Sequence, residues 1–141
     1  MIKLKFALLA SSISLDQQTN TLSILHALDS ITVPSVPFTI PSMVIVAVFR
    51  KEQGSSDLVK VSEAIVSPSG KRYEIKVPEM NFGGKLINRF LMTVNGFKFE
   101  EFGTYKFVLE WEGKTAEIEF EVFKQKTVQN LGDYLAANAP S

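Results

Sequence analysis

The fold is decided by residues 103–123, which read Gly-Thr-Tyr-Lys-Phe-Val-Leu-Glu-Trp-Glu-Gly-Lys-Thr-Ala-Glu-Ile-Glu-Phe-Glu-Val-Phe. Apolar residues alternate with polar or charged ones on both sides of Glu112-Gly113, and this period of two is typical of β-strands that bury one face. A tight turn at Glu112-Gly113 joins the two strands as a hairpin and places Leu109 opposite Ala116. Because a slip by one residue would bury the glutamates of the second strand, we predict that this register is well specified.

The same register orders the charged side chains of this hairpin. Lys106 is expected opposite Glu119, which is a favourable cross-strand pair. Glu117, Glu119 and Glu121 share one face at intervals of about 6.5 to 7 Å, a spacing that overlaps the separation of the two carboxylates in glycosidases. A row of glutamates opposite a lysine is more typical of a solvated face that discourages further strand pairing. We therefore predict a structural role for these glutamates.

The N-terminal part of the chain predicts a second hairpin. Ile2–Ser12 alternates in the same way, Asp16–Asn20 supplies turn-forming residues, and Thr21–Val33 is apolar and β-branched. The apolar residues of Thr21–Val33 change from one parity to the other after Ile24. One extra residue would explain this change, so we expect a β-bulge near Leu25.

The middle of the chain predicts the remaining strands. Three prolines in residues 34–41 indicate a connector, whereas Ser42–Lys51 is almost continuously apolar and predicts a central strand covered on both faces. Asp57–Val66, Lys71–Val77 and Lys85–Val94 follow as further strands. About eight short strands without a long helical pattern predict an all-β protein, an antiparallel β-sandwich of the immunoglobulin-like or a related kind.

The length of the chain indicates one domain, residues 1–126, followed by a C-terminal tail, residues 127–141. In the tail, Leu131, Tyr134 and Leu135 repeat at helical spacing after an asparagine that favours the N-cap position. A helix of about eight residues is not stable alone in water. We therefore expect the tail to form a short helix that docks on the domain or on a partner.

The charge and composition of the chain exclude several classes of function. The 141 residues carry 15 Lys+Arg and 15 Asp+Glu, a balance that lacks the long-range field with which proteins attract nucleic acids or anionic membranes. There are no cysteines and one histidine, which excludes disulfides, thiolate metal sites, cysteine nucleophiles and metal sites built on two histidines. The apolar run Phe6–Ala10 is too short for a signal peptide, and no run is long enough for a membrane span. We expect a cytoplasmic location.

Few residues are candidates for catalysis or ligand binding. His26 lies in an apolar strand, and the chain has no nucleophile motif that a catalytic base would serve. The turn at Asp16 has oxygen ligands at alternate positions but lacks the glycine and glutamate of a calcium loop. The glycine-rich loop Asn81–Gly84, with Lys85 and Arg89, could contact an anion, although its spacing differs from that of phosphate-binding loops. We predict no catalytic, cofactor-binding or metal-binding residue, and no cofactor.

Aromatic and apolar residues outside the predicted strands indicate a partner. If Phe82 or Phe102 is exposed, we expect it to contact a partner, because aromatic side chains anchor protein interfaces more often than most others. With Leu131, Tyr134 and Leu135 of the tail, they are the predicted partner contacts. The sequence thus predicts a non-enzymatic binding or accessory domain that contacts a protein partner through loops or an edge of the sandwich. The alternatives are a structural or assembly subunit of the phage or virion type, which would self-associate through edge strands or the tail, and a hydrolase that uses carboxylates alone.

Several stretches of the chain also resemble those of a known group of proteins. The similar stretches are Phe6–Ala10, Leu22–Ile31, Ser67–Lys71, Glu101–Lys114 and Phe120–Val122. They make the chain similar to a family of small bacterial proteins that is called only a domain of unknown function. The resemblance implies the fold and supplies no catalytic residue. Gly103-Thr-Tyr105 is also similar to the tyrosine corner of immunoglobulin-like sandwiches, in which the tyrosine hydroxyl bonds to the backbone upstream.

Overall fold

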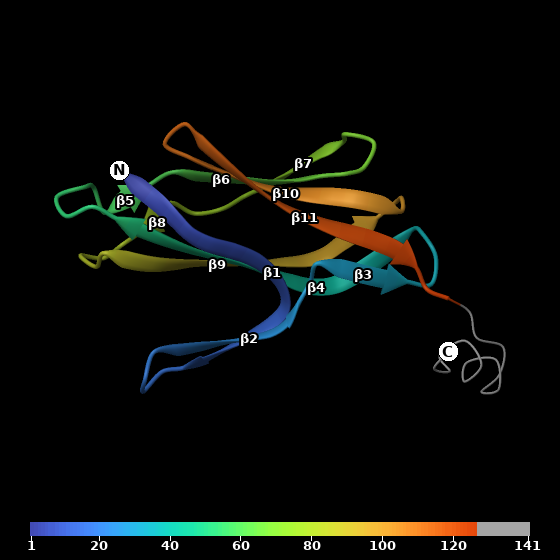
Figure 1. The fold of residues 1–141 in the computed structure, drawn as a ribbon, viewed down its shortest axis with the longest axis horizontal. Coiled ribbons are helices and arrows are strands. Elements are labelled where there is room, and N and C mark those ends of the chain that lie inside the picture. Colours follow the sequence, from blue (N-terminus) through green and yellow to red (C-terminus); the bar gives the residue numbers. More distant parts are fainter. Residues whose placement is uncertain (127–141) are drawn as a thin grey trace, which may run out of the picture.

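The computed structural model of the protein describes residues 1–126, and this part of the chain is all-β (Figure 1). It contains eleven strands. They are β1 (Ile2–Asp16), β2 (Thr21–Ala27), β3 (Ser30–Val33), β4 (Phe38–Lys51), β5 (Leu58–Val59), β6 (Val61–Val66), β7 (Arg72–Ile75), β8 (Met80–Asn81), β9 (Ile87–Phe99), β10 (Gly103–Trp111) and β11 (Lys114–Lys124). The predicted C-terminal helix and the predicted partner contacts of the tail lie outside the described residues.

The strands form two larger sheets and one small one. The four-stranded sheet has the order β2-β1-β4-β9 and is antiparallel throughout. The five-stranded sheet has the order β3-β11-β10-β6-β7, in which β3 runs parallel to β11 and the other pairs are antiparallel. The β5-β8 pair forms the third sheet. The two larger sheets lie one above the other in Figure 1, and a single cluster of buried apolar side chains from both fills the space between them.

The β10–β11 hairpin has the predicted register. Leu109 pairs with Ala116 and Lys106 with Glu119, and the turn lies at Glu112-Gly113. Lys106 nevertheless makes its ion pair diagonally, with Nζ at 3.5 Å from Oε2 of Glu117. A long flexible side chain can reach a diagonal neighbour on a pleated sheet as readily as the residue directly opposite.

The corner before β10 is fixed by Tyr105 and Gly103. The Tyr105 hydroxyl donates a hydrogen bond of 2.8 Å to the backbone carbonyl oxygen of Glu101. Gly103 has a φ of +127°, and a Cβ atom there would lie 3.0 Å from Cγ of Pro68. Only glycine fits both this backbone conformation and this close approach.

β4 is an inner strand of the four-stranded sheet, as predicted from its apolar sequence, but it begins at Phe38 and includes Pro41, which was predicted to lie in the connector. Met43, Ile45 and Phe49 face the core between the two larger sheets. Val46 points away from that core, yet it is also fully buried. Both faces of β4 are therefore covered, although the second face has no sheet packed on it in residues 1–126.

The region predicted as one strand from Thr21 to Val33 is instead two strands in different sheets. β2 pairs with β1, whereas β3 pairs with β11. The expected bulge near Leu25 is absent, because Ala10–Ala27 and Ser12–Leu25 keep one register. The apolar residues of this region change from even to odd positions because the chain passes from β2 in one sheet to β3 in the other. The chain bends at Asp29, between the two strands, and His26 near the end of β2 has a φ of +55°.

Candidate functional site

The candidate site is the side of the four-stranded sheet that faces away from the five-stranded sheet, here called the outer face. The register aligns its side chains in rows across β1, β4 and β9. The rows consist of Phe6, Val48 and Arg89, then Leu8, Val46 and Leu91, then Ala10, Val44 and Thr93. The valines of β4 form a buried floor, whereas Phe6 is 45% exposed. The outer face therefore offers a continuous apolar surface, partly open to solvent.

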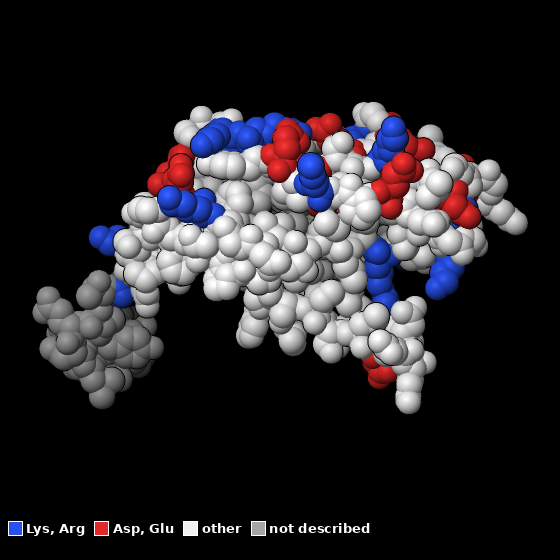
Figure 2. Space-filling model, turned by 180° about the vertical axis from the view of Figure 1, so that it is seen from behind, with Lys and Arg blue, Asp and Glu red and all other residues white. Residues whose placement is uncertain are grey.

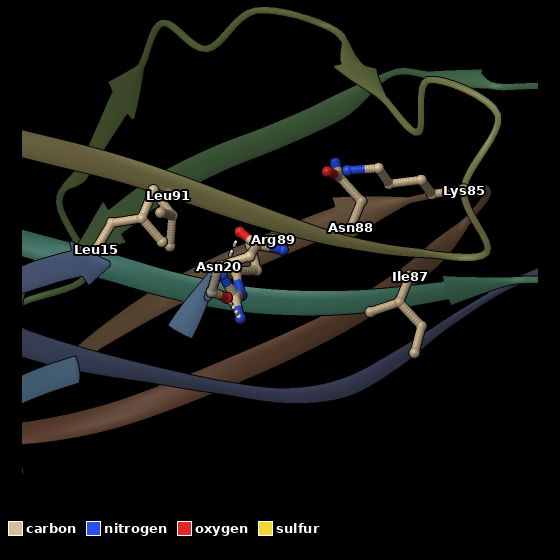
Figure 3. Close-up of a pocket in the computed structure, with 7 residues that line it drawn as sticks. All are labelled: Leu15, Asn20, Lys85, Ile87, Asn88, Arg89 and Leu91. Atoms are coloured by element: carbon tan, nitrogen blue, oxygen red, sulfur yellow. Dashed lines mark hydrogen bonds between the residues drawn. The ribbon is translucent and has the colours of Figure 1, made fainter. Parts of the chain in front are cut away.

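The β1–β2 hairpin curls over this face and closes one end of it. β2 and β9 are the two edge strands of the sheet. Even so, the guanidinium of Arg89 on β9 donates hydrogen bonds of 3.2 Å to Oδ1 and 2.8 Å to the backbone oxygen of Asn20, at the hairpin turn (Figure 3). The sheet must therefore bend strongly across its width. Asn20 favours the turn because it tolerates a left-handed backbone, here with a φ of +56°.

A groove lies between the hairpin and β9. Its volume is about 360 Å³, and it is lined by apolar, amide and basic side chains. Leu15 comes from the hairpin, Ile87 and Leu91 come from β9, and Lys85 lies just before β9 (Figure 3). Such a groove can take apolar side chains and can pair a nearby carboxylate with Lys85.

The charges of the protein are divided unevenly between the two larger sheets. The four strands of the four-stranded sheet contain six basic residues and one acidic residue, Asp16. The strands of the five-stranded sheet contain six acidic and four basic residues. Figure 2 shows charged side chains gathered along one side and a hollowed, largely uncharged side next to the projecting hairpin. The net charge of the sequence is zero, yet basic residues outnumber acidic ones in the strands of the four-stranded sheet.

The basic residues flank one end of the apolar surface. Lys3 pairs with Arg50 across β1 and β4, in the row next to Phe6, and Arg89 lies in the Phe6 row itself. No aspartate or glutamate lies in β4 or β9. The outer face is therefore suited to a ligand that combines apolar groups with carboxylates.

The prediction that Phe82 is an exposed partner contact is wrong. Phe82 is 2% exposed and belongs to the core cluster. The loop is held inward by Asp57, whose backbone oxygen accepts a hydrogen bond from the Phe82 amide and whose carboxylate accepts one from the Gly84 amide. Phe102 is 37% exposed, in the connection between β9 and β10, so it stays a predicted partner contact.

The backbone amides of the glycine-rich loop already donate hydrogen bonds to acceptors within the protein. The Gly83 amide donates to the side chain of Asn81, and the Gly84 amide donates to Asp57. The side chain of Lys51 forms an ion pair with Asp57, and this hydrogen bond holds the pKa of the Asp57 carboxyl below its ordinary value. These amides are therefore not free for an anion in this conformation.

The other candidate residues lie at the surface or in a turn. His26 is exposed beside a strand end, and Glu117, Glu119 and Glu121 lie exposed along β11. Oδ1 of Asp16 accepts hydrogen bonds from the amides of the hairpin turn. Within residues 1–126, no three His, Asp or Glu side chains are grouped as ligands for a metal ion. The same residues contain no helix that could cross a membrane.

Glu63 is an unusual residue that was not among the candidates predicted from the sequence. It lies in β6 on the core side with Val61 and Ile65 and is 1% exposed. Neither carboxylate oxygen has a hydrogen-bond partner among the described residues. Burial raises the pKa of this carboxyl to about 7. The alternation of Val61, Glu63 and Ile65 was a usable signal, because it placed an acidic residue on an apolar face.

Comparison with known proteins supplies a family but no activity. A protein-family model matches residues 5–123, and it describes a family of unknown function. No curated protein matches the chain. The matched segment contains β2, β4, β9 and most of β1, the strands of the four-stranded sheet.

Proposed function

The chain belongs to the family of unknown function DUF6941, and we propose that it is a non-catalytic binding or accessory domain that holds a protein partner on the outer face of its four-stranded sheet. The supporting observation is the apolar surface around Phe6 and Leu91, which is rimmed by Arg50 and Arg89. Exposed apolar surface of this kind, bordered by polar groups, marks interaction sites on soluble proteins. We keep the cytoplasmic location as a prediction.

We further propose that the fold is a β-sandwich related to the immunoglobulin-like kind. The hydrogen bond from Tyr105 to Glu101 supports this relation, because that contact is a hallmark of such sandwiches. Loops and sheet surfaces of these folds commonly carry binding while the core stays constant.

The second candidate is an assembly subunit whose outer face binds another copy of the chain. The exposed apolar residues of the hairpin, Leu15 and Leu25, favour it, since they could pack against an equivalent hairpin. The molecular mass in solution separates the two functions. A closed oligomer that dissociates on Leu15→Ser would support assembly, and a monomer would favour binding of a different protein.

The binding proposal is tested with two matched substitutions. Phe6 on the outer face and Phe123 on β11 are 45% and 46% exposed, so Phe6→Glu and Phe123→Glu remove similar apolar area from different sheets. We expect an affinity pull-down from the native host to lose its specific partner with Phe6→Glu and to keep it with Phe123→Glu. Equal retention by both variants would place the binding surface elsewhere.

A further inference from the structure

We propose that the partner adds an extended, acidic segment of its own chain to the free edge of β9, as a fifth strand of the four-stranded sheet. This inference rests on the proposed function, because that edge borders the outer face. It names the mode of binding and the chemistry of the bound segment. Three features of β9 carry it: its backbone, the groove beside it and the charge around it.

The register shows which backbone groups of β9 point away from the sheet. The Lys51 amide donates a hydrogen bond of 2.9 Å to the Leu86 oxygen, and the β4–β9 register continues from there to Asn95 without a shift. In an antiparallel pair, residues that bond to the neighbouring strand alternate with residues whose amide and carbonyl groups point away from it. The residues that turn these groups to the free edge are therefore Ile87, Arg89, Leu91, Thr93 and Asn95.

These edge groups are open to another strand. β9 pairs with β4 alone, and within residues 1–126 none of the backbone hydrogen bonds made outside the strand ladders involves them. Residues 87–95 thus present an unpaired edge roughly 30 Å long, which is a template for strand pairing.

The other edge strands of the two larger sheets are shorter. β3 and β7 have four residues each and β2 has seven, whereas β9 has 13 residues and no proline. Short strands and prolines are two means by which proteins prevent pairing at a sheet edge. β9 has neither, so it is the edge best suited to accept a strand.

The groove described above reaches this edge. Its lining includes Ile87 and Arg89 on one face of β9 and Asn88 on the other (Figure 3), so it extends around the edge of the strand. Every second side chain of an added strand would lie on the same side as the outer face. Apolar side chains at these positions would contact Leu91 and the hairpin residue Leu15.

The charge at this edge favours an acidic segment. Neither Lys85 nor Arg89 forms an ion pair among the described residues, and Arg89 donates its hydrogen bonds to the uncharged Asn20. A second copy of β9 would bring only basic side chains, because β9 contains no aspartate or glutamate. A strand with carboxylates, from a different protein, complements both basic residues.

The test is amide hydrogen exchange of the full chain, measured by NMR with and without a synthetic peptide. The peptide is as long as residues 87–95, alternates threonine with valine and carries a glutamate near each end. A peptide with lysines in place of the glutamates is the control for charge. We expect the glutamate peptide to bind several-fold more tightly and to slow exchange at the five edge-facing amides. Exchange should stay unchanged at the amides that already bond to β4, which are those of Asn88, Phe90, Met92 and Val94.

Two proline variants test the strand edge itself. Thr93→Pro removes an edge-facing amide and no hydrogen bond to β4, so it should weaken peptide binding many-fold. Ser23→Pro is the matched control on β2, where the register also turns the Ser23 amide away from β1, and it should leave binding unchanged. Equal losses in the two variants would overturn the proposal.

Three further results would also overturn it. They are no slowing with the glutamate peptide at millimolar concentration, slowing without the alternation along β9, and equal affinity for the two peptides. Slowing that grows with protein concentration in the absence of peptide would assign the edge to a second copy of the chain and exclude the proposed occupant. If the edge amides stay unprotected while Phe6→Glu still abolishes partner capture, strand addition is wrong and the proposed function stands.

Discussion

Arg89 of β9 donates two hydrogen bonds to Asn20, 69 positions earlier in the chain. This contact links β9, one edge strand of the four-stranded sheet, to the turn between β1 and β2. β2 is the other edge strand. It holds the hairpin over the outer face, and the groove between them owes its shape to this bend.

Removing this contact should loosen the hairpin without unfolding the domain. For Arg89→Ala we expect faster amide hydrogen exchange in residues 12–25, with a loss of global stability near 1 kcal/mol, because an exposed charged hydrogen bond contributes little. Lys98→Ala removes a basic side chain from the same strand and is the control. If exchange in the hairpin is the same in both variants, Arg89 does not hold it in place.

The local features of the fold could be predicted from the sequence, and the long-range ones could not. The register of β10 and β11 and the central position of β4 follow from alternation and apolar content. After β2 the chain crosses to the other sheet, because β3 pairs with β11, about 90 residues away. No local sequence pattern encodes this pairing.

The candidate site was harder to predict for the same reason. The outer face consists of side chains from three strands, and its curvature depends on a contact between the hairpin turn and β9. Phe82 was misplaced because its loop contains turn-forming glycines, which indicate exposure. The residue that draws it inward, Asp57, lies in a different segment.

The hydrogen bond from Tyr105 to Glu101 predicts a measurable contribution to stability. Tyr105→Phe removes the bond to Glu101 and leaves the buried ring in place, so we expect a loss of about 1 kcal/mol in the free energy of unfolding. Urea denaturation measures this loss. Tyr73→Phe also removes one hydroxyl and should change stability by less than about 0.5 kcal/mol. Equal effects of the two substitutions would show that the corner contributes nothing.

The close approach at Gly103 predicts a larger effect. Gly103→Ala adds a Cβ atom at 3.0 Å from Cγ and 3.1 Å from Cβ of Pro68, at a positive φ. We expect a loss of about 2 to 3 kcal/mol from strain and overpacking, measured as a lower melting temperature. Gly113→Ala, where φ is also positive but no atom lies within 4 Å, should lose about 1 kcal/mol. A smaller effect at Gly103 than at Gly113 would contradict the packing described at this corner.

Glu63 predicts a specific dependence of stability on pH. Burial raises its pKa from 4.5 to about 7, so the folded protein binds this proton more tightly than the unfolded chain. Stability must then fall as pH rises through this interval and level off above it. The loss amounts to about 3 kcal/mol, since one pKa unit corresponds to about 1.4 kcal/mol.

Glu63→Gln mimics the protonated carboxyl and should remove this loss. We would compare unfolding free energies of the two proteins at about pH 5 and about pH 8. The wild type should lose stability relative to the variant as pH rises. Parallel curves would mean that the carboxylate of Glu63 is stabilised in the folded protein.

The most direct test of the outer face as the binding surface is methyl NMR of the full chain with the partner captured in the pull-down. The probes are Leu8 and Leu91 on the outer face, and Val108 of β10, which lies on the far side of the five-stranded sheet from the core cluster. We predict that the partner shifts the methyl signals of Leu8 and Leu91 and leaves those of Val108 unchanged. Shifts at Val108 with unchanged signals from Leu8 and Leu91 would contradict the account.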